Sequence, residues 1–278
     1  MTVWGAVTRP VGEGRNVVRF IWEHPANQGK RFQVLGRAAR FQIEGRLLHR
    51  RALARLGARS VIWAELHRTA GSKVLYANPP DYPEMLVWAA RLRPGDLFVD
   101  VGANVGTYTI WAGELGAHVI AVEPASDAFV LLRQNVELNG YPVELVQSAA
   151  GPMNGTAMFT SGRDCVNHLD PAGDVQVDVI TVDDLLRGRV ARGVKIDVEG
   201  HEMDVLSGCV ESLASHRIGL LQIEWNRSSE TAVGTDRTPV ADLLTGFGYR
   251  LYRPTPEGLL MDAGSHPGYG PDVFAMRG

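Results

Sequence analysis

Residues 97–123 read LFVDVGANVGTYTIWAGELGAHVIAVE, and this stretch decides the fold. Residues 97–101 are rich in β-branched and aromatic side chains and predict a strand that enters a glycine turn at residues 102–106. A helix is expected over residues 107–115 with Gly116 as its stop, and a second strand over residues 118–122 ends on Glu123. This order of strand, turn, helix and strand is typical of the first half of a doubly wound nucleotide-binding sheet.

The glycine turn distinguishes between cofactors. A dinucleotide site has the spacing G-x-G-x-x-G, because the second glycine lets the backbone approach a pyrophosphate. Here Gly102 and Gly106 are separated by three residues, Asn104 carries a side chain between them, and Asp100 precedes the turn. A carboxylate repels a pyrophosphate but suits the cationic groups of S-adenosylmethionine. Glu123 is placed to accept hydrogen bonds from two ribose hydroxyls. We therefore expect S-adenosylmethionine, and an NAD-dependent oxidoreductase is the less favoured alternative.

The composition is that of an ordinary globular protein. The chain has 278 residues, of which 45% are hydrophobic and 21% charged. It has no run of 18 apolar residues and no basic segment followed by an apolar core at the N-terminus, so we expect a cytoplasmic protein without a membrane span. Cys165 and Cys209 are too few for a disulfide framework and are expected to stay reduced. The sequence has no CxxC or HExxH metal motif.

Charge is distributed unevenly along the chain. Residues 1–70 contain 13 Lys and Arg against four Glu and no Asp, although the whole chain carries a net charge of −3. Such a segment suits nucleic acid or an acidic partner. However, its arginines are interspersed with apolar residues, which favours helices with a solvated basic face. We expect neither a nucleic-acid nor a membrane partner, and a homodimer is one alternative for the oligomeric state.

Two regions follow from the pattern along the chain. Residues 1–92 predict an N-terminal α+β cap, and residues 93–278 predict the cofactor-binding domain. In the cap we expect a strand at 17–22, two or three short helices over 28–57, a β-hairpin over 61–76 and a helix over 82–92. In the domain we expect a helix over 127–138 capped by Ser126, strands at 143–148, 175–182, 194–197 and 220–223, a hairpin-like excursion near 154–160, and an antiparallel pair at 249–252 and 273–276.

Polar side chains close five of the predicted strands, namely Asp100, Glu123, Ser148, Asp197 and Glu224. In an open α/β sheet, ligands bind outside the carboxyl ends of the strands, so these side chains should converge on one crevice. Neighbouring carboxylates are costly unless they face a cation, a ligand hydroxyl or a metal. The crevice is therefore the expected functional site.

Several stretches resemble a known family. The runs FVDVGANVGTYT, VIAVEPAS, VDVITVDDLL and, above all, VKIDVEGHEMDVLSG resemble the FkbM family of S-adenosylmethionine-dependent methyltransferases. The resemblance covers residues 95–225. It implies a class I methyltransferase (Rossmann-like) α/β fold, with a seven-stranded sheet and helices on both faces. It also implies O-methylation of a hydroxyl on a small molecule or sugar in natural-product or glycan biosynthesis.

The resemblance also implies roles for individual residues. Carried over by position, the cofactor-binding residues are Asp100, Gly102, Asn104, Gly106 and Glu123, and the reacting end is lined by Asp197, Glu199 and His201. We add Thr107, Ser148 and Asp197 to the predicted cofactor-binding set, and Glu224 to the predicted catalytic set.

Methyl transfer to a hydroxyl requires a group that removes the hydroxyl proton. His201, Asp197 and Glu224 are the candidate bases, and His168, in a polar loop, is a weaker one. Asp197 and Glu224 close strands that should be neighbours, so Mg²⁺ is an alternative there, although it is not expected. Glu199 either takes part in catalysis or anchors its loop through backbone N–H groups.

Several alternatives remain open at this point. Trp225 either walls the substrate pocket or packs in the core. A non-catalytic S-adenosylmethionine-binding protein and an N-methyltransferase of a small molecule are alternatives to the O-methyltransferase.

Overall fold

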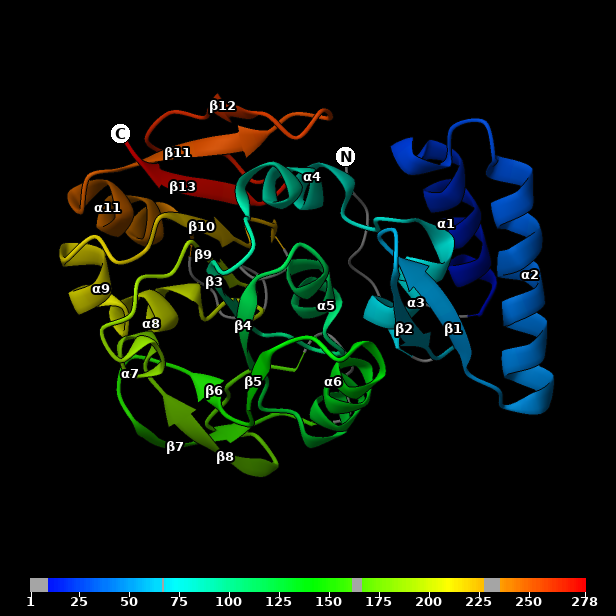
Figure 1. Ribbon diagram of the computed structural model, residues 1–278. Coiled ribbons are helices and arrows are strands. Elements are labelled where there is room, and N and C mark those ends of the chain that lie inside the picture. The colour runs from blue at the N-terminus through cyan, green and yellow to red at the C-terminus, as the bar shows by residue number, and fades with distance from the viewer. Residues whose placement is uncertain (1–9, 67, 162–166, 228–235) are drawn as a thin grey trace.

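The protein is organised around one large, mostly parallel sheet, seen near the centre of Figure 1. A computed structural model describes residues 10–66, 68–161, 167–227 and 236–278. The spatial order of the main sheet is β12 (Leu260–Asp262), β11 (Tyr249–Pro254), β13 (Val273–Arg277), β10 (Leu220–Ile223), β9 (Gly193–Ile196), β3 (Leu97–Val101), β4 (His118–Val122) and β5 (Val143–Val146). The strands from β10 to β5 are parallel. The order reverses between β3 and β9, which is where such sheets bind ligands.

Helices cover both faces of the sheet. One face carries α4 (Tyr82–Arg91), α5 (Thr107–Glu114) and α6 (Ser126–Asn139), and the other carries α7 (Val182–Leu186), α8 (Glu202–Ser207), α9 (Val210–Ala214) and α11 (Thr238–Gly246). Side chains alternate along each strand, so Phe98 packs in the first layer while Val99 and Val101 pack in the second. The predicted doubly wound α/β architecture is confirmed.

The strand count differs from the prediction. In the part of the chain that the structure describes, the main sheet has eight strands rather than seven, because β12 pairs with the outer edge of β11. The expected antiparallel pair is confirmed as β11 and β13, and β13 also pairs antiparallel with β10. Ser126 does not cap α6: the helix begins at Ser126 itself, and Ala125 is the preceding residue with extended backbone.

A second, three-stranded sheet forms the hairpin-like excursion. Its order is β6 (Ala149–Ala150), β8 (Val175–Ile180) and β7 (Gly155–Phe159), with β7 antiparallel to β8. The predicted strand at 143–148 is therefore divided, because the chain leaves the main sheet after Val146 and joins β8 through Ala149.

Two N-terminal predictions are wrong. Residues 17–22 lie inside α1 (Pro10–Glu23), where Ile21 is buried and the adjacent Trp22 is exposed, as on a helix with one face in the core. Residues 31–48 form one helix, α2 (Arg31–Leu48), rather than two or three short ones, after a short 3₁₀ turn at Pro25–Asn27. Gly45 lies inside α2, where the absence of a side chain permits a close contact with Leu66.

The hairpin predicted over residues 61–76 lies closer to the N-terminus in the structure. The actual hairpin joins β1 (Ala52–Leu56) to β2 (Ser60–Ala64), and the residues expected to form its second strand make α3 (Thr69–Tyr76). Gly71 lies in α3 rather than in a turn. A Cβ there would lie 2.7 Å from the Trp63 carbonyl oxygen, so the glycine lets α3 pack directly on β2.

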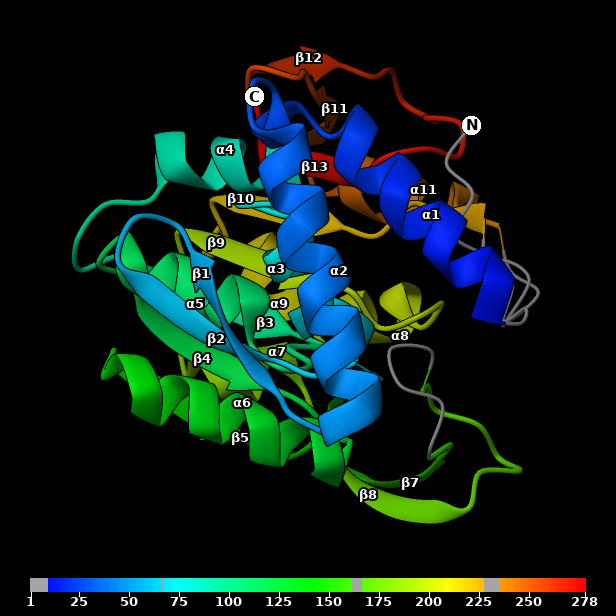
Figure 2. The same ribbon diagram turned by 90° about the vertical axis from the view of Figure 1, so that its right-hand side faces the viewer.

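The N-terminal elements are attached to the helix layer of the main sheet. Glu114 accepts hydrogen bonds from the backbone N–H groups of Ala58, Arg59 and Ser60, and Asn135 accepts one from Trp63. The hydrophobic core on this side continues from the sheet into α1, α2 and α3. Figure 2 shows α1 and α2 on the outside of this layer. None of the helices in the described parts of the chain is long and apolar enough to cross a membrane. The division at residue 92 stays a prediction.

Candidate active site

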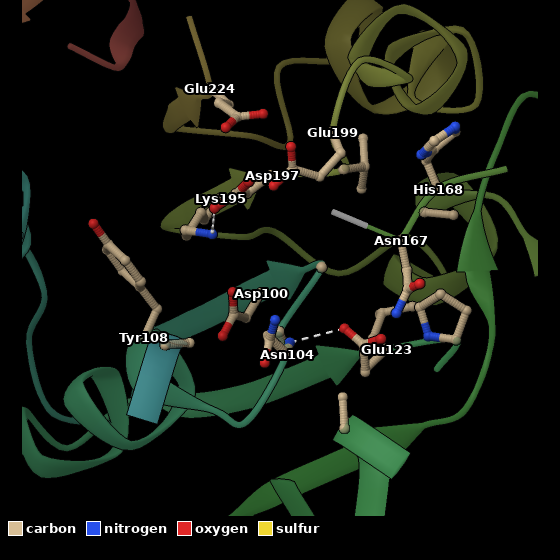
Figure 3. A pocket seen from close by; sticks show the side chains of 18 of the residues that line it. Asp100, Asn104, Tyr108, Glu123, Asn167, His168, Lys195, Asp197, Glu199 and Glu224 are labelled. Carbon is tan, nitrogen blue, oxygen red and sulfur yellow. Dashed lines mark hydrogen bonds and ion pairs between the residues drawn. The ribbon is translucent and has the colours of Figure 1, made fainter. Parts of the chain in front are cut away.

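A cavity of about 220 Å³ lies at the carboxyl ends of the parallel strands (Figure 3). It brings together ten of the eleven predicted site residues, namely Asp100, Gly102, Asn104, Thr107, Glu123, Ser148, Asp197, Glu199, His201 and Glu224. Gly106 is not in the lining. The cavity has two sides, which we call the turn half (Asp100, Gly102, Asn104 and Glu123) and the carboxylate half (Lys195, Asp197, Glu199, His201 and Glu224).

The turn half is shaped by backbone that only certain residues adopt. Gly102 has φ +75°, and a Cβ there would lie 1.9 Å from the Asp197 carbonyl oxygen, so glycine is required at this contact between the two halves. Asn104 has φ +51°, a left-handed conformation that asparagine tolerates better than most residues. Gly106 precedes α5 with φ +92°, and its Cα faces Leu132, so its place in the structure is in the turn and packing.

Asp100 is fully buried at the end of β3. Its Oδ2 accepts a 2.6 Å hydrogen bond from the Thr109 hydroxyl, whereas its Oδ1 is buried and has no hydrogen-bond partner among the described residues. Burial raises the pKa of Asp100, and the positive charge of Lys195 opposes that rise. A buried acceptor without a partner is costly, which indicates that a ligand donor completes this position.

Glu123 is held by the backbone at the end of β4. Its two oxygens accept 2.8 Å hydrogen bonds from the N–H groups of Asn104 and Ala125, which fixes the carboxylate beside the glycine turn. Burial raises the pKa of Glu123 to about 7, although these backbone bonds oppose the rise. Each carboxylate oxygen has a further lone pair, so Glu123 can still accept from a ligand.

An apolar wall adjoins the turn half. The small sheet contributes Ala149, Ala150 and Phe159 to the cavity lining, and Pro124 and Ala128 lie on the main-sheet side. Ser148, which follows β5, lines the cavity next to Ala149 and Ala150, so the residues at this wall have small side chains.

Lys195 is the main functional residue that sequence reasoning missed. Its Nζ lies 2.9 Å from Asp197 Oδ2 and 4.7 Å from the ring centroid of Tyr108, and the residue is 3% exposed. Burial alone lowers the pKa of Lys195, but the negative charges of Asp197 and Asp100 outweigh it and raise that pKa. The signal available in the sequence was a lysine inside the otherwise apolar strand β9. The structure pairs this lysine in register with Asp100.

Three carboxylates meet opposite the turn half. One carboxylate oxygen each of Asp197, Glu199 and Glu224 lie within 4.8 Å of one another, and β9 and β10 are neighbours as predicted. Burial and the charge of Asp197 raise the pKa of Glu199 to about 8, and the same causes hold the pKa of Glu224 well above its usual range. Asn226 donates to Glu224. Carboxylate oxygens are the ligands that Mg²⁺ prefers, so these three residues could hold such an ion.

The loop after β9 has a different anchor from the one considered in the sequence. Glu202, rather than Glu199, accepts the Gly200 N–H at 3.1 Å, and Glu202 also pairs with Arg237. Glu199 itself has φ +54°, a conformation that is uncommon outside glycine and asparagine and that often occurs at functional sites.

Two histidines stack at the side of the cavity. The rings of His168 and His201 are 6.1 Å apart with an interplanar angle of 22°, and both line the cavity. His201 Nδ1 lies 2.8 Å from Asp204 Oδ2, which orients the ring. His201 Nε2 is buried and makes no hydrogen bond with the residues that the structure describes.

Other expectations have mixed outcomes. The N-terminal region contributes Thr69, Lys73 and Asp81 to the cavity lining. Trp225 is 1% exposed and donates to the Pro267 carbonyl oxygen at 2.9 Å; it belongs to the core rather than to the cavity wall. Cys209 is a buried free thiol, and Cys165 lies outside the described residues.

The comparison with protein families identifies the class. The Methyltransferase FkbM domain matches residues 100–251, more than half of the chain. The chain therefore belongs to the FkbM family of S-adenosylmethionine-dependent methyltransferases, and the predicted class I methyltransferase fold is confirmed. This membership excludes the NAD-dependent oxidoreductase.

Three individual proteins that are similar to the chain share between 14% and 29% sequence identity with it. The chain is 29% identical over 156 residues to the hexuronic acid methyltransferase AglP of Haloferax volcanii, and the match covers 54% of this chain and 62% of AglP. Among solved structures, a magnesium protoporphyrin IX methyltransferase from Synechocystis matches with 16% identity and a TM-score of 0.41, covering 70% of this chain and 76% of the other. An rRNA methylase from Streptococcus thermophilus matches with 14% identity and a TM-score of 0.37, covering 69% and 91%.

Proposed function

We propose that the protein transfers the methyl group of S-adenosylmethionine to a hydroxyl of a sugar or small molecule. The observation that carries this proposal is one cavity with a cofactor-like turn half facing a cluster of polar groups at the reacting side. The hexuronic acid methyltransferase AglP, a partial relative, supports a sugar as the acceptor class. A role in glycan or natural-product biosynthesis follows from that acceptor class.

The turn half suits the cofactor. Asp100 Oδ1, buried and without a partner in the described structure, can accept from the ammonium group, and Glu123 can accept from the ribose hydroxyls. Gly102 lets the backbone approach the cofactor, and Asn104 and Thr107 line the same side. The small residues from Ser148 to Ala150 leave room for the adenine ring. Gly106 acts indirectly, by permitting the turn.

The carboxylate half suits the acceptor. The bound cofactor supplies an electrophilic methyl group on a sulfonium, so the remaining task of the protein is to position and deprotonate the acceptor hydroxyl. Asp197, Glu199 and Glu224 can accept hydrogen bonds from sugar hydroxyls. Lys195 holds Asp197 in place and offsets part of the negative charge.

His201 is the proposed general base. Its Nδ1 is oriented by Asp204, which leaves Nε2 able to take a proton at the cavity lining. A base held in this way by a third group is the usual arrangement for proton abstraction. Glu199 and Glu224 are the alternative bases. Coordination of Mg²⁺ by the three carboxylates is a second way to lower the pKa of a hydroxyl, and it is favoured only by their proximity.

The test uses purified protein and methyl-labelled S-adenosylmethionine with uronic acids, neutral sugars and amino sugars, with and without a chelator. Label on a sugar oxygen supports the proposal, and loss of turnover with chelator supports the Mg²⁺ route. Label on a nitrogen atom would replace the proposed O-methylation with the N-methyltransferase alternative. Binding of the cofactor without transfer to any sugar or small molecule would favour a non-catalytic protein, and absence of cofactor binding would contradict both.

A further inference from the structure

Helix α2 carries an apolar surface on the side that faces away from the core. Its buried residues are Val34, Ala38, Phe41 and Gly45. Because an α-helix turns 100° per residue, five other apolar or small residues share the opposite face: Phe32, Gly36, Ala39, Ile43 and Leu47. We call these five residues the α2 stripe. Figures 1 and 2 place α2 at the outside of the molecule, on the side away from the main sheet.

The large side chains of the α2 stripe are open to solvent. Phe32 is 80% exposed, Leu47 is 74% exposed and Ile43 is 58% exposed. The stripe continues onto α1, because the ring of Trp22 packs edge-on against Phe32 at 5.7 Å. Single exposed apolar residues are ordinary, whereas a contiguous stripe along a helix marks an interaction surface.

The surroundings of the stripe are basic. Residues 10–56 contain ten Lys and Arg against three Glu and no Asp. Arg40 and Arg46 fall on the two edges of the stripe, and both are exposed. Among the described residues, Lys30, Arg46 and Arg50 have no acidic partner, so their charges are available to an anionic surface.

We propose that the α2 stripe and its flanking arginines dock the protein on an anionic lipid membrane surface. This proposal is independent of the proposed function, and it differs from the expectation, based on sequence alone, that the protein has no membrane partner. An interfacial helix of this type places Trp, Phe and Leu at the boundary between headgroups and acyl chains while Lys and Arg contact anionic headgroups.

Charge favours this partner over the alternatives. Arg40 pairs with Glu44 at 2.7 Å, whereas Arg46 has no acidic partner among the described residues. A symmetric pair of α2 stripes would bring the Arg46 charges of both copies into one apolar interface, which is unfavourable. A nucleic acid would contact the arginines but leave the apolar side chains in water. A bilayer satisfies both features, because its negative surface would attract the basic N-terminal elements and its interior would accept the apolar side chains.

The experiment is co-sedimentation of the full chain with phosphatidylcholine vesicles, with or without phosphatidylglycerol, at about 0.1 M and about 1 M salt. We expect binding to the anionic vesicles at low salt and weaker binding at high salt or to neutral vesicles. The triple variant Phe32→Ser, Ile43→Ser, Leu47→Ser should weaken binding at least about tenfold. The double variant Arg46→Glu, Arg50→Glu should weaken it to a similar degree, because each residue near the surface contributes.

Matched control variants separate the α2 stripe from general surface properties. Leu259→Ser with Met261→Ser removes two similarly exposed apolar residues from the region of β12, and Arg250→Glu reverses an exposed charge on β11. Both controls should bind like the unchanged protein. Absence of binding to anionic vesicles, or equal binding by the triple variant and its control, would overturn the proposal. A concentration-dependent dimer that the triple variant abolishes, without vesicle binding, would assign the stripe to a second copy of the chain instead.

Discussion

The two halves of the cavity are built in different ways. The turn half comes from one continuous segment, in which Asp100 lies in the last two residues of β3, Glu123 directly follows β4 and backbone N–H groups hold Glu123 in place. The carboxylate half joins residues from β9, β10 and the loop after β9, and its groups interact mainly through charge. Both halves contain carboxyl groups with raised pKa values. The turn half is fixed by its own backbone, whereas the carboxylate half depends on how separate segments pack and gathers several acids whose charges perturb one another, as proton transfer needs. The following predictions test that difference, beginning with the largest expected effect.

Gly102→Ala should damage both halves together. The added Cβ would meet the Asp197 carbonyl oxygen, which cannot move without displacing the end of β9, and φ +75° is strained for alanine. We expect a loss of at least about 3 kcal/mol in the free energy of unfolding, measured by urea denaturation. Gly36→Ala, in an open helical position, is the control and should stabilise by about 0.5–1 kcal/mol. Equal stabilities would mean that the two halves are not in the contact described.

Asp100→Asn should act on the turn half. The amide keeps the size of the side chain but removes the negative charge that we propose faces the cationic cofactor. We expect S-adenosylmethionine affinity to fall about 100-fold or more, measured by calorimetry, because a charged hydrogen bond in a buried site is lost. Asp178→Asn, on an exposed position of β8, should leave the affinity unchanged. Unchanged affinity in Asp100→Asn would remove Asp100 from the cofactor site.

His201→Gln should act on the reacting side alone. We expect kcat to fall about 100-fold while the dissociation constant of S-adenosylmethionine stays the same, because a general base contributes to the chemical step and not to cofactor binding. Single-turnover rates with the labelled cofactor measure the first quantity, and calorimetry measures the second. Activity equal to that of the unchanged protein would exclude His201 as the base and leave Glu199 and Glu224.

The pH dependence of the free energy of unfolding should reflect the raised pKa of Glu199 in the carboxylate half. Burial and neighbouring charge raise the pKa of Glu199 to about 8 in the folded protein, from an ordinary value of 4.5. The folded state therefore binds more protons than the unfolded state between these values, so the free energy of unfolding falls as the pH rises from about 4.5 to about 8.

Glu199→Gln tests this linkage. The fall in Tm of the cofactor-free protein between pH values of about 5 and about 8 should be about 2–4 °C smaller than in the unchanged protein. Glu257→Gln, at an exposed position, is the control and should keep the full fall. An equal fall in Tm in the Glu199→Gln and Glu257→Gln variants would show that the pKa of Glu199 is not raised in the folded protein.

The prediction from sequence succeeded where local chemistry determined the structure. Residues 97–123 predict β3, the turn, α5 and β4 in order, and the strand-end acids Asp100, Glu123, Asp197 and Glu224 do converge. It failed in the N-terminal region, where residues 17–22 are helical and the hairpin ends at Ala64. Short apolar runs are compatible with a strand or a helix, and the partner against which they pack decides between them.

The sequence by itself determined the class of fold and the turn, because a glycine turn between a strand and a helix has strict backbone requirements that only a few residue types meet. It also determined the family, above all through the stretch VKIDVEGHEMDVLSG. The tertiary structure decided the rest. It places Lys195 against Asp197 and the ring of Tyr108, brings Glu199 and Glu224 together, and leaves Phe32 exposed on α2. These features depend on distances between segments far apart in the chain, and neither periodicity nor composition contains those distances.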